Sequence, residues 1–473
     1  MNVIATTGSV LGPAELIAVG VSKTGSLPAA IDKAFDGQLS AALADDKFKG
    51  TAGALTAFRS LGRVPGKWLA VVGTGSGSPE DVRRAAGAAA SFARDKGLAS
   101  LRLEVGDHAE FQVEGIIAGN YRFDMYKDED DRKSPLESVV LVNADADGIE
   151  TGAVLGAARS LTRDLVNGPA EDIHPQSMAA AARKLASGQL SVDVWDYAKL
   201  KAEGMGGIEA VGRGSDRKPV FVHMVYTPNG TPTAEVALIG KGVTFDAGGL
   251  SIKPSSGMMD MRCDMGGAGA VLGAMSALEG LGVNAKVHGI FGAAENMLGP
   301  NAFKLGDVLT FRNGKKAEIH NTDAEGRLLL ADCLSFASEI DEVTHIVDLA
   351  TLTGAAVVAL GEHYTACYST HDDFARTLID AAEAGGEAFW HMPLEQLYKD
   401  KLKGEMATIK NLGDRWGGSI TAALFLQNFV GDDKIWAHLD IAGPALIGSK
   451  ERHLAKGATG AGVPGLLRWL RDL

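Results

Sequence analysis

The sequence predicts an α/β protein with two domains: a smaller N-terminal α/β domain, and a larger C-terminal domain whose mixed, mostly parallel sheet is flanked by helices. The length of 473 residues is more than one hydrophobic core usually supports. Short apolar runs alternate with segments of helical spacing, as in α/β domains. The 60 glycines indicate many tight loops, and no low-complexity tract accompanies them. We place the N-terminal domain at 1–145, a connecting helix at 146–166 and the C-terminal domain at 167–473.

Two apolar runs, Trp68–Val72 and Ser138–Val142, are predicted strands of the N-terminal domain. Between them, Ser78 and Pro79 predict the start of a helix, because serine is a good cap and proline is tolerated in the first turn. Residues 150–166 carry apolar side chains at helical spacing, which predicts the helix that connects the two domains.

The glycine-rich segment Gly73–Ser78 follows a predicted strand and precedes a predicted helix, as a dinucleotide-binding loop would. A dinucleotide fingerprint requires glycine where Ser78 stands. It also requires an acidic residue at the end of a second strand about twenty residues further on, and the sequence offers none there. The sequence therefore favours a plain glycine-rich turn over nucleotide binding.

The C-terminal domain contains an apolar strand, Val236–Gly240, that leads into a charged and glycine-rich segment. Glycines and a proline disfavour a helix over 241–254, so we predict a loop that places charged side chains at the edge of the strand. Asp264 then precedes Ala268–Met275, whose small residues predict a tightly packed helix. A single charge in such a segment is usually a cap or a solvated side chain. The functional interpretation therefore depends on how many charges gather here.

The octet Asn321–Leu328 is the most informative segment, because it carries Asp323, Glu325 and Arg327 at alternate positions. Alternate residues of an extended chain point to one side, so these three side chains are expected to converge. Two carboxylates beside a guanidinium suit a divalent metal ion and an anionic reaction centre. The alternative is a capped helix start with solvated charges, since acidic residues are favoured near helix N-termini. The apolar run Leu328–Ala331 predicts a buried helix.

Separate segments along the chain carry a resemblance to a known family. The segments are Arg163–Ala170, Lys241–Lys253, Asp264, Asn321–Leu328, Asp348–Ala355, Gly417–Ala423, Trp436–Gly443 and Lys456–Gly460. In this order they resemble the leucyl aminopeptidases, the cytosol aminopeptidase family, over the C-terminal two-thirds of the chain. The resemblance implies a metal-dependent aminopeptidase, a hydrolase that releases leucine and other, mainly apolar, residues from peptides with a free N-terminus.

The resemblance also implies a site for two divalent metal ions. The metal ligands that it implies are Lys241, Asp246, Asp264, Asp323 and Glu325. Lys241 and Asp264 would hold one ion and Asp323 the other, whereas Asp246 and Glu325 would contact both. The catalytic pair that it implies is Lys253 and Arg327. The chemistry agrees, because four carboxylates balance two divalent cations, and a lysine amine can be a ligand when burial and a nearby cation favour its neutral form.

Carboxylate-rich ligation favours Mn²⁺ as the metal, with Zn²⁺ and Mg²⁺ as alternatives. The resemblance further implies a bicarbonate at Arg327 and a homohexamer, which the N-terminal domain helps to build. The net charge of −13 disfavours a nucleic-acid partner. We find no signal peptide and no apolar run of membrane-spanning length, and three cysteines do not form a disulfide framework. The protein is therefore expected to be cytoplasmic, without a membrane partner.

Other functions fit the sequence less well. A histidine-based zinc protease is disfavoured because no His-Glu-x-x-His pair occurs, and His438 is predicted to be buried and hydrogen-bonded instead of a ligand. A two-metal phosphatase would be expected to carry histidine ligands. A catalytically inactive scaffold would show degraded ligands, whereas all seven implied site residues are present. Cys263 lacks an obvious base partner and is predicted to be a packed thiol.

Overall fold

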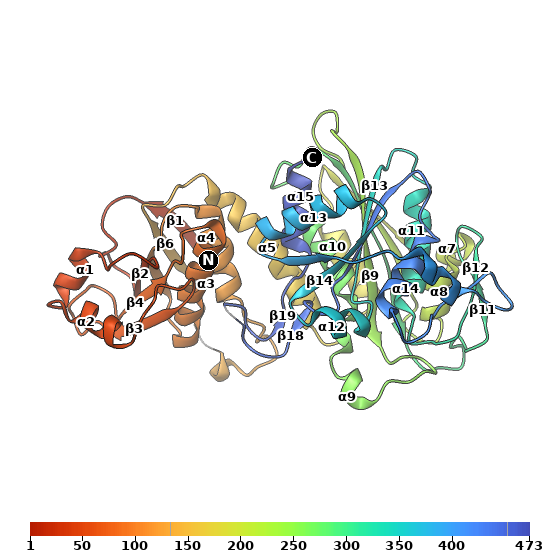
Figure 1. Cartoon of the computed structure of the whole chain (residues 1–473), viewed down its shortest axis with the longest axis horizontal. Coiled ribbons are helices and arrows are strands. Elements are labelled where there is room, and N and C mark those ends of the chain that lie inside the picture. Colours follow the sequence, from red (N-terminus) through yellow and green to blue (C-terminus); the bar gives the residue numbers. More distant parts are fainter. Residues whose placement is uncertain (133, 452) are drawn as a thin grey trace. The chain divides into compact units, whose positions relative to one another are not determined.

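The computed structural model describes residues 1–132, 134–451 and 453–473. The chain folds into two compact units: Met1–Ser160 with Gly448–Lys456, and Leu161–Ile447 with Gly457–Leu473 (Figure 1). Helix α5 (Gly148–Asn167) lies where the connecting helix 146–166 was predicted, and the division between the units falls within it. The return of Gly448–Lys456 to the first unit was not predicted from the sequence.

The first unit is built on a six-stranded sheet in the order β1-β6-β5-β2-β4-β3. Its strands are β1 (Asn2–Thr6), β2 (Leu16–Val21), β3 (Leu55–Arg59), β4 (Trp68–Gly73), β5 (Ser100–Glu104) and β6 (Ser138–Val142). Neighbouring strands are parallel, except that β3 pairs antiparallel with β4. Its other helices are α1 (Ala29–Ala34), α2 (Gln38–Asp45), α3 (Pro79–Lys96), α4 (Ala109–Asn120) and the 3-10 helix η1 (Glu129–Asp131).

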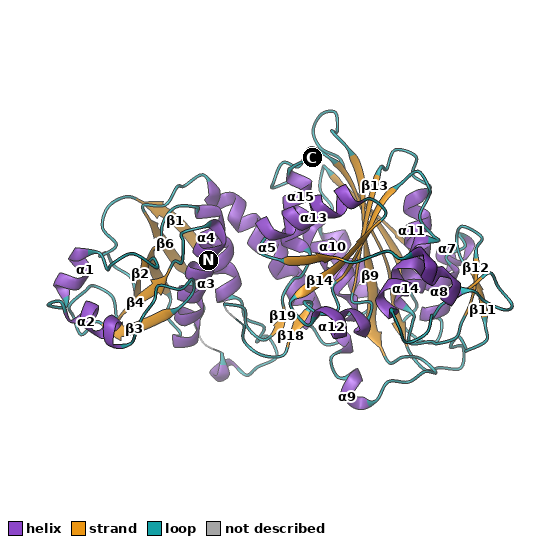
Figure 2. Ribbon diagram, in the orientation of Figure 1, coloured by secondary structure: helices purple, strands orange, loops and turns teal. Residues whose placement is uncertain are grey.

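Two hydrophobic cores cover opposite faces of this sheet, because side chains alternate along each strand. Leu16 and Ala18 of β2 face the core that includes α3 and α4, whereas Ile17 and Val19 face the core that includes α1 and α2. Figure 2 shows the strands of this unit between helices. Both strands predicted for this part of the sequence are confirmed, by β4 and β6.

The glycine-rich turn between β4 and α3 is closed by groups of the chain itself. Ser78 caps α3 by accepting a hydrogen bond from the main-chain N–H of Asp81, and Pro79 is in the first turn, as predicted. The Asp81 carboxylate accepts hydrogen bonds from the main-chain N–H and the hydroxyl of Ser76, at 2.8 and 2.7 Å. A carboxylate of the protein therefore already occupies donors that a nucleotide phosphate would need. This agrees with the predicted plain turn.

The second unit is built on an eight-stranded mixed sheet in the order β15-β14-β17-β13-β9-β10-β8-β7. The strands are β7 (Leu190–Trp195), β8 (Val220–Tyr226), β9 (Glu235–Asp246), β10 (Lys286–Asn296), β13 (His345–Ala350), β14 (Tyr364–Ser369), β15 (Ala388–His391) and β17 (Ile435–Asp440). The central run β17-β13-β9-β10 is parallel. Antiparallel pairs join β14 to β17, β10 to β8 and β8 to β7.

Helices and two small sheets complete the second unit. The helices are α6 (Pro175–Lys184), α7 (Tyr197–Ala202), α8 (Gly206–Gly212), α9 (Ser255–Met258), α10 (Gly266–Ala277), α11 (Gly326–Ser338), α12 (Gly354–Leu360), α13 (Asp372–Ala384), α14 (Gly418–Gln427) and α15 (Val463–Arg471), with 3-10 helices η2 (Met261–Met265) and η3 (Gln396–Leu402). One small sheet contains β11 (Val308–Thr310), β12 (Lys316–Glu318) and β16 (Ile409–Lys410); the other contains β18 (Leu446–Ile447) and β19 (Gly457–Ala458). Helix α10 confirms the predicted small-residue helix.

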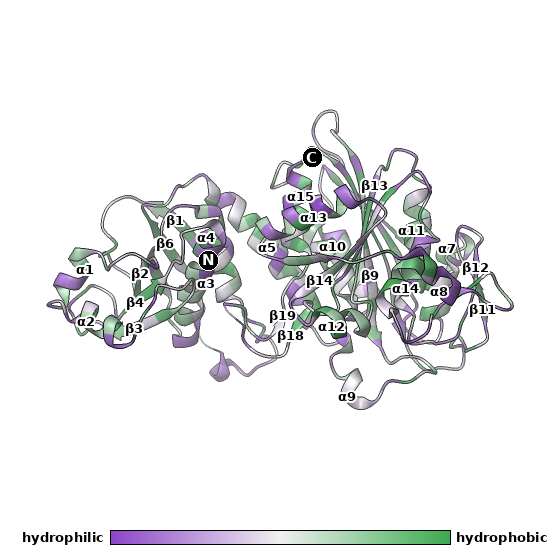
Figure 3. Ribbon diagram, viewed as in Figure 1, coloured by the Kyte–Doolittle hydropathy of each residue, from purple (hydrophilic) through white to green (hydrophobic). Residues whose placement is uncertain are grey.

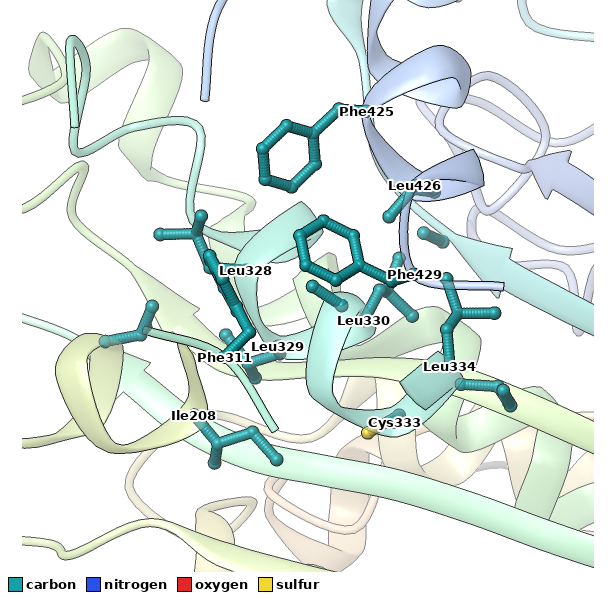
Figure 4. Packing of buried hydrophobic residues seen from close by; sticks show 14 of the residues in the cluster. Ile208, Phe311, Leu328, Leu329, Leu330, Cys333, Leu334, Phe425, Leu426 and Phe429 are labelled. Carbon is teal, nitrogen blue, oxygen red and sulfur yellow. The ribbon is translucent and has the colours of Figure 1, made fainter. Parts of the chain in front are cut away.

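Helix α11 lies in a large hydrophobic cluster of the second unit. Its leucines pack with Phe311, Phe425 and Phe429, whose rings are labelled in Figure 4. Figure 3 shows the hydrophobic character of α14, the helix that carries Phe425. The buried helix predicted from the run Leu328–Ala331 is therefore confirmed, although α11 already begins at Gly326.

A buried carboxylate also ties α11 to its surroundings. Asp332 accepts hydrogen bonds from the main-chain N–H groups of Gly207, Ile208 and Arg312, at 2.7, 3.0 and 3.0 Å. Two of these donors lie at the start of α8, where a helix has unpaired N–H groups. Asp332 thus fixes α8 and the turn after β11 relative to α11. Within the described ranges, we find no helix whose length and apolar character would let it cross a membrane.

Candidate active site

Strand β9 carries two of the predicted site residues, Lys241 and Asp246. The loop predicted over 241–254 is therefore wrong in its first part, because the strand continues to Asp246. The spacing of the two residues is odd, which in a regular strand would place them on opposite faces. In the pairing of β9 with β10, however, the register shifts between Ala294 and Glu295 of β10. Thr244 is the extra residue on the β9 side of this shift. This bulge lets both side chains reach the same site.

The ammonium group of Lys241 lies among buried acceptors. Its Nζ donates to Asp264 Oδ1 at 2.7 Å and to the main-chain oxygen of Thr351 at 2.9 Å, and it lies 3.0 Å from Glu325 Oε1. Asp264 comes from η2, immediately before α10. A Cβ at position 326 would overlap the end of the Lys241 side chain, so a residue other than glycine there would displace the Lys241 ammonium.

Lys253 joins the other carboxylates of the site. Its Nζ lies 2.9 Å from Asp246 Oδ2 and 2.6 Å from Asp323 Oδ1. The second oxygen of Asp246 accepts hydrogen bonds from Asn296 Nδ2 and from the main-chain N–H of Gly248, both at 2.8 Å. Gly248 has a φ of 86°, a conformation that glycine adopts without strain. The loop after β9 can therefore turn back and carry Lys253 to the end of the strand.

The octet Asn321–Leu328 is not extended, which corrects the geometry predicted from alternate positions. Its first residues form a turn, and Arg327 lies in the first turn of α11. Asp323 and Glu325 still converge, because one oxygen of each lies within 4.8 Å of the other and of an oxygen of Asp246. The alternative of solvated charges at a capped helix start does not hold, since Glu325 and Arg327 are buried.

Arg327 is directed by a main-chain carbonyl. Its Nη1 donates to the Asn411 oxygen at 2.8 Å, whereas its buried Nε has no hydrogen-bond partner within the described ranges. Burial lowers the pKa of Arg327 to about 10, and the charges of Glu325 and Asp440 oppose that shift. The guanidinium remains positively charged at neutral pH.

The remaining charges of the site are strongly coupled. Burial lowers the pKa of Lys241, but the carboxylates of Asp264 and Glu325 outweigh burial and raise the pKa above its ordinary value. Burial also lowers the pKa of Lys253, but Asp246 and neighbouring acids outweigh burial and raise this pKa above its ordinary value. Burial, and then the charge of Glu325, raises the pKa of Asp246 to about 6. Both lysines are therefore protonated when no metal ion is bound.

The donor set fits divalent cations. Asp246, Asp323 and Glu325 offer oxygens close enough to share an ion. Asp264 Oδ2 and Glu325 Oε2 are buried and have no hydrogen-bond partner in the described part of the chain. Unpaired buried carboxylate oxygens are costly, and a metal ion satisfies them. The side chains that the resemblance implies as metal ligands thus lie together, with Lys253 and Arg327 beside them.

Comparison with known proteins places the chain in a family. Residues 160–467 match the model of the cytosol aminopeptidase family catalytic domain, and residues 18–130 match the model of the N-terminal domain of that family. The chain belongs to the cytosol aminopeptidase family. It is therefore a hydrolase of the peptidase class, and the enzyme class predicted from the resemblance is confirmed.

Relatives of this family are similar along most of the chain. A probable cytosol aminopeptidase of Aquifex aeolicus is 44% identical over 76% of this chain and 73% of its own length. One from a Picosynechococcus species is 41% identical over 93% of this chain and 92% of its own length.

Solved structures confirm the predicted two-domain α/β fold class. A mutant of tomato leucine aminopeptidase has a TM-score of 0.90 and 33% identity, and the match covers all of this chain and 97% of that one. The bottromycin maturation enzyme BotP in complex with Mn has a TM-score of 0.87 and 35% identity, over 97% of this chain and 99% of that one.

Sequence reasoning missed residues that support the site through neutral groups. Thr351 offers Lys241 a main-chain oxygen, and its hydroxyl donates to Asp264 Oδ1 at 2.9 Å. Asn296 binds Asp246, and Asn411 binds Arg327. Only Thr351 had a signal, since it lies within a segment that resembles the family. His438 is fully buried and 2.6 Å from Asp348, so its predicted role as a hydrogen-bonded core residue is confirmed.

Proposed function

We propose that the chain is a metal-dependent aminopeptidase that releases N-terminal residues, leucine and other mainly apolar ones, from peptides with a free N-terminus. The observation that carries this proposal is the convergence of buried carboxylates on one end of β9, with two lysines and an arginine among them. Two divalent ions would be held there, one by Lys241 and Asp264 and the other by Asp323. Asp246 and Glu325 would contact both.

Mn²⁺ is the metal that we favour, with Zn²⁺ and Mg²⁺ as alternatives. Oxygen-rich ligation suits Mn²⁺, and the structurally similar BotP is a complex with Mn. When bound, the two ions would polarise the scissile carbonyl and lower the pKa of a water molecule for attack. Capture of the free substrate amine at the site would restrict cleavage to the terminal peptide bond.

The protein supplies positive charge where the reaction develops negative charge. Lys253 Nζ lies 2.9 Å from Asp246 Oδ2 and 2.6 Å from Asp323 Oδ1, so a scissile carbonyl bound among these carboxylates would lie close to its ammonium. A fixed cation at this place stabilises the tetrahedral species, an effect worth about 2.7–4 kcal/mol for a single donor in other enzymes. Arg327, held by Asn411, has an unpartnered Nε–H that suits a planar anion such as bicarbonate, which would relay the proton to the leaving amine.

We also propose an assembly and a location for the protein. The proposed cytoplasmic location is supported by the name of the family whose two domain models the chain matches, and the proposed homohexamer rests on the sequence resemblance to that family. The cysteines Cys263, Cys333 and Cys367 are free and buried, as in a reducing compartment. Burial raises the pKa of the Cys263 thiol to about 12, which supports a packing role.

The deciding experiment is hydrolysis of leucine p-nitroanilide by metal-stripped protein, titrated with Mn²⁺, Zn²⁺ and Mg²⁺. An N-acetylated leucine p-nitroanilide serves as the control. If metal restores cleavage of the free-amine substrate but not of the acetylated control, the proposal is supported, and the restored rates rank the metals. If no metal restores cleavage of this substrate or of a panel of dipeptides, the alternative of a catalytically inactive scaffold replaces the proposed aminopeptidase. Hydrolysis of phosphate esters by the same preparation would favour the phosphatase alternative.

A further inference from the structure

Asn411 is a fully buried residue that directly follows β16 and binds the loop in front of α11. Its Oδ1 accepts hydrogen bonds from the main-chain N–H groups of His320 and Asn321, at 2.8 and 3.3 Å. Its Nδ2 donates to the main-chain oxygens of Asn321 and Ala324, at 2.7 and 3.3 Å. The carboxamide thus uses two donors and two acceptor positions, its full capacity, on one short stretch of main chain.

The main chain of Asn411 makes two further hydrogen bonds, one with Glu318 and one with Arg327. Its N–H donates to the Glu318 oxygen at 2.9 Å, which continues the pairing of β16 with β12. Its own oxygen accepts the hydrogen bond from Arg327 Nη1 at 2.8 Å. One residue therefore holds the loop that carries Asp323 and Glu325 and also the guanidinium of Arg327.

The segment that precedes Asn411 is itself held in place by the Glu318 side chain. The buried carboxylate of Glu318 accepts hydrogen bonds from the main-chain N–H groups of Met406 and Ala407, the latter at 2.7 Å. The same carboxylate pairs with His320 at 3.0 Å. Asn411 therefore follows a segment that is held to β12 by main-chain pairing and by the Glu318 side chain, which gives the loop a defined partner.

The loop carries two carboxylates that lie close to a third. One oxygen each of Asp323, Glu325 and Asp246 lie within 4.8 Å of one another, and the repulsion between these like charges is offset by the ion pairs with Lys241 and Lys253. Hydrogen bonds of the loop to itself are few: Asp323 N–H to Asn321 Oδ1 at 2.8 Å and Ala324 N–H to the Asn321 oxygen at 3.4 Å. Thr322 is tied to Ser251, Gly248 and Asn296. The four bonds from the Asn411 side chain hold the neighbouring residues His320, Asn321 and Ala324.

We propose that Asn411 is a positioning residue for the reaction: it sets the places of Asp323, Glu325 and Arg327 without touching substrate or metal. This inference rests on the proposed two-metal aminopeptidase activity. Displacement of catalytic groups by about 1 Å can cost about a hundredfold in rate. Loss of an outer partner of a metal ligand costs about 10–100-fold in metal affinity or activity. A purely structural role would change stability and leave both quantities alone.

The test compares Asn411→Ala and the near-isosteric Asn411→Asp with the matched control Asn428→Ala. Asn428 makes the same kind of contacts at the end of α14, where its Nδ2 donates to the oxygens of Leu424 and Phe425 at 2.9 and 3.2 Å. All three variants lose side-chain hydrogen bonds to main-chain carbonyls. The control loses them away from the loop that Asn411 binds.

Two quantities are measured on each full-length variant: kcat and KM for leucine p-nitroanilide with saturating Mn²⁺, and Mn²⁺ affinity of metal-stripped protein by calorimetry. For both Asn411 variants we expect kcat to fall at least about tenfold with KM changed less than about threefold, and Mn²⁺ affinity to fall about tenfold. Asn428→Ala should match the unmodified protein in both. Circular dichroism establishes that each variant is folded.

The outcomes separate this inference from the proposed function. If the unmodified protein cleaves the substrate but the Asn411 variants behave like Asn428→Ala, the positioning role is overturned. It is also overturned if neither Asn411 variant folds, because Asn411 would then be required for the fold. If the unmodified protein shows no metal-restored cleavage, the proposed function fails, whereas weakened Mn²⁺ binding by folded Asn411 variants would still support the role in placing Asp323 and Glu325.

Discussion

Lys241 is expected to lose a proton when a divalent metal ion binds. In the metal-free protein its Nζ donates to Asp264 at 2.7 Å and to the Thr351 carbonyl at 2.9 Å, and contacts Glu325 at 3.0 Å. These acceptors surround an ammonium and raise its pKa against the opposing effect of burial. A metal ligand requires the lone pair of the neutral amine, so the proton must leave as the ion enters.

The sign and size of the pH dependence follow from this exchange. Because the pKa of Lys241 is raised, the ammonium persists throughout the neutral range, and every binding event there must release its proton. Metal affinity should therefore increase with pH by about tenfold per unit, or about 1.4 kcal/mol, from Lys241 alone. Asp246, whose pKa is about 6, adds a contribution mainly at lower pH, and Asp264 adds another because burial raises its pKa well above the ordinary value.

The assay is calorimetric titration of Mn²⁺ into metal-stripped protein between about pH 7 and about pH 8, a window above the Asp246 transition. Two buffers of different ionisation enthalpy report the number of protons released. The comparison is Lys241→Met, which keeps an unbranched side chain and lacks the amine. The unmodified protein should release one proton more than the variant. Equal proton release by the two proteins would refute Lys241 as a metal ligand that gives up its proton.

Further substitutions test the other groups. Glu325→Gln preserves the volume of the side chain but removes one carboxylate charge. The value of kcat/KM should therefore fall by at least about 10³-fold, while the circular dichroism spectrum is unchanged. Unchanged turnover would refute the assignment of Glu325 to the active site. Lys253→Ala should lower kcat by about 10²–10³-fold with little change in KM, and an effect on KM alone would contradict its transition-state role. Asp332→Asn turns one of two acceptor oxygens into a donor that faces an N–H group. The free energy of unfolding in urea should then fall by about 1–3 kcal/mol, and an unchanged midpoint would show that the three main-chain bonds do not matter.

The sequence predicted which charged side chains lie together better than it predicted their local geometry. Lys241 and Asp246 were placed in a loop, because the glycines that follow them obscure the end of a strand that continues to Asp246. The bulge at Thr244 that brings both to one site depends on pairing with β10, which no local pattern reveals. Similarly, the alternate spacing of the charges predicted an extended octet, whereas helix α11, with its buried leucines, already begins at Gly326.

The neutral supports of the site were harder to predict. Asn411 contacts the loop through main-chain groups of residues about ninety positions earlier, and such contacts place no demand on the side chains there. A lone asparagine after a two-residue strand has no periodicity or spacing to mark it. Asp332 was hidden for a different reason, since it appeared as an ordinary polar position within an apolar helix.

The two lysines explain how this fold tolerates the carboxylates that a metal site requires. Asp246, Asp264, Asp323 and Glu325 would repel one another in a buried space, but Lys241 lies between two of them and Lys253 between the other two. On the proposed function, we expect divalent ions that bind here to pair with the carboxylates in place of the lysines, instead of filling an unpaired acidic cavity. The same exchange would free the Lys253 ammonium from Asp246 and Asp323 for its proposed catalytic role.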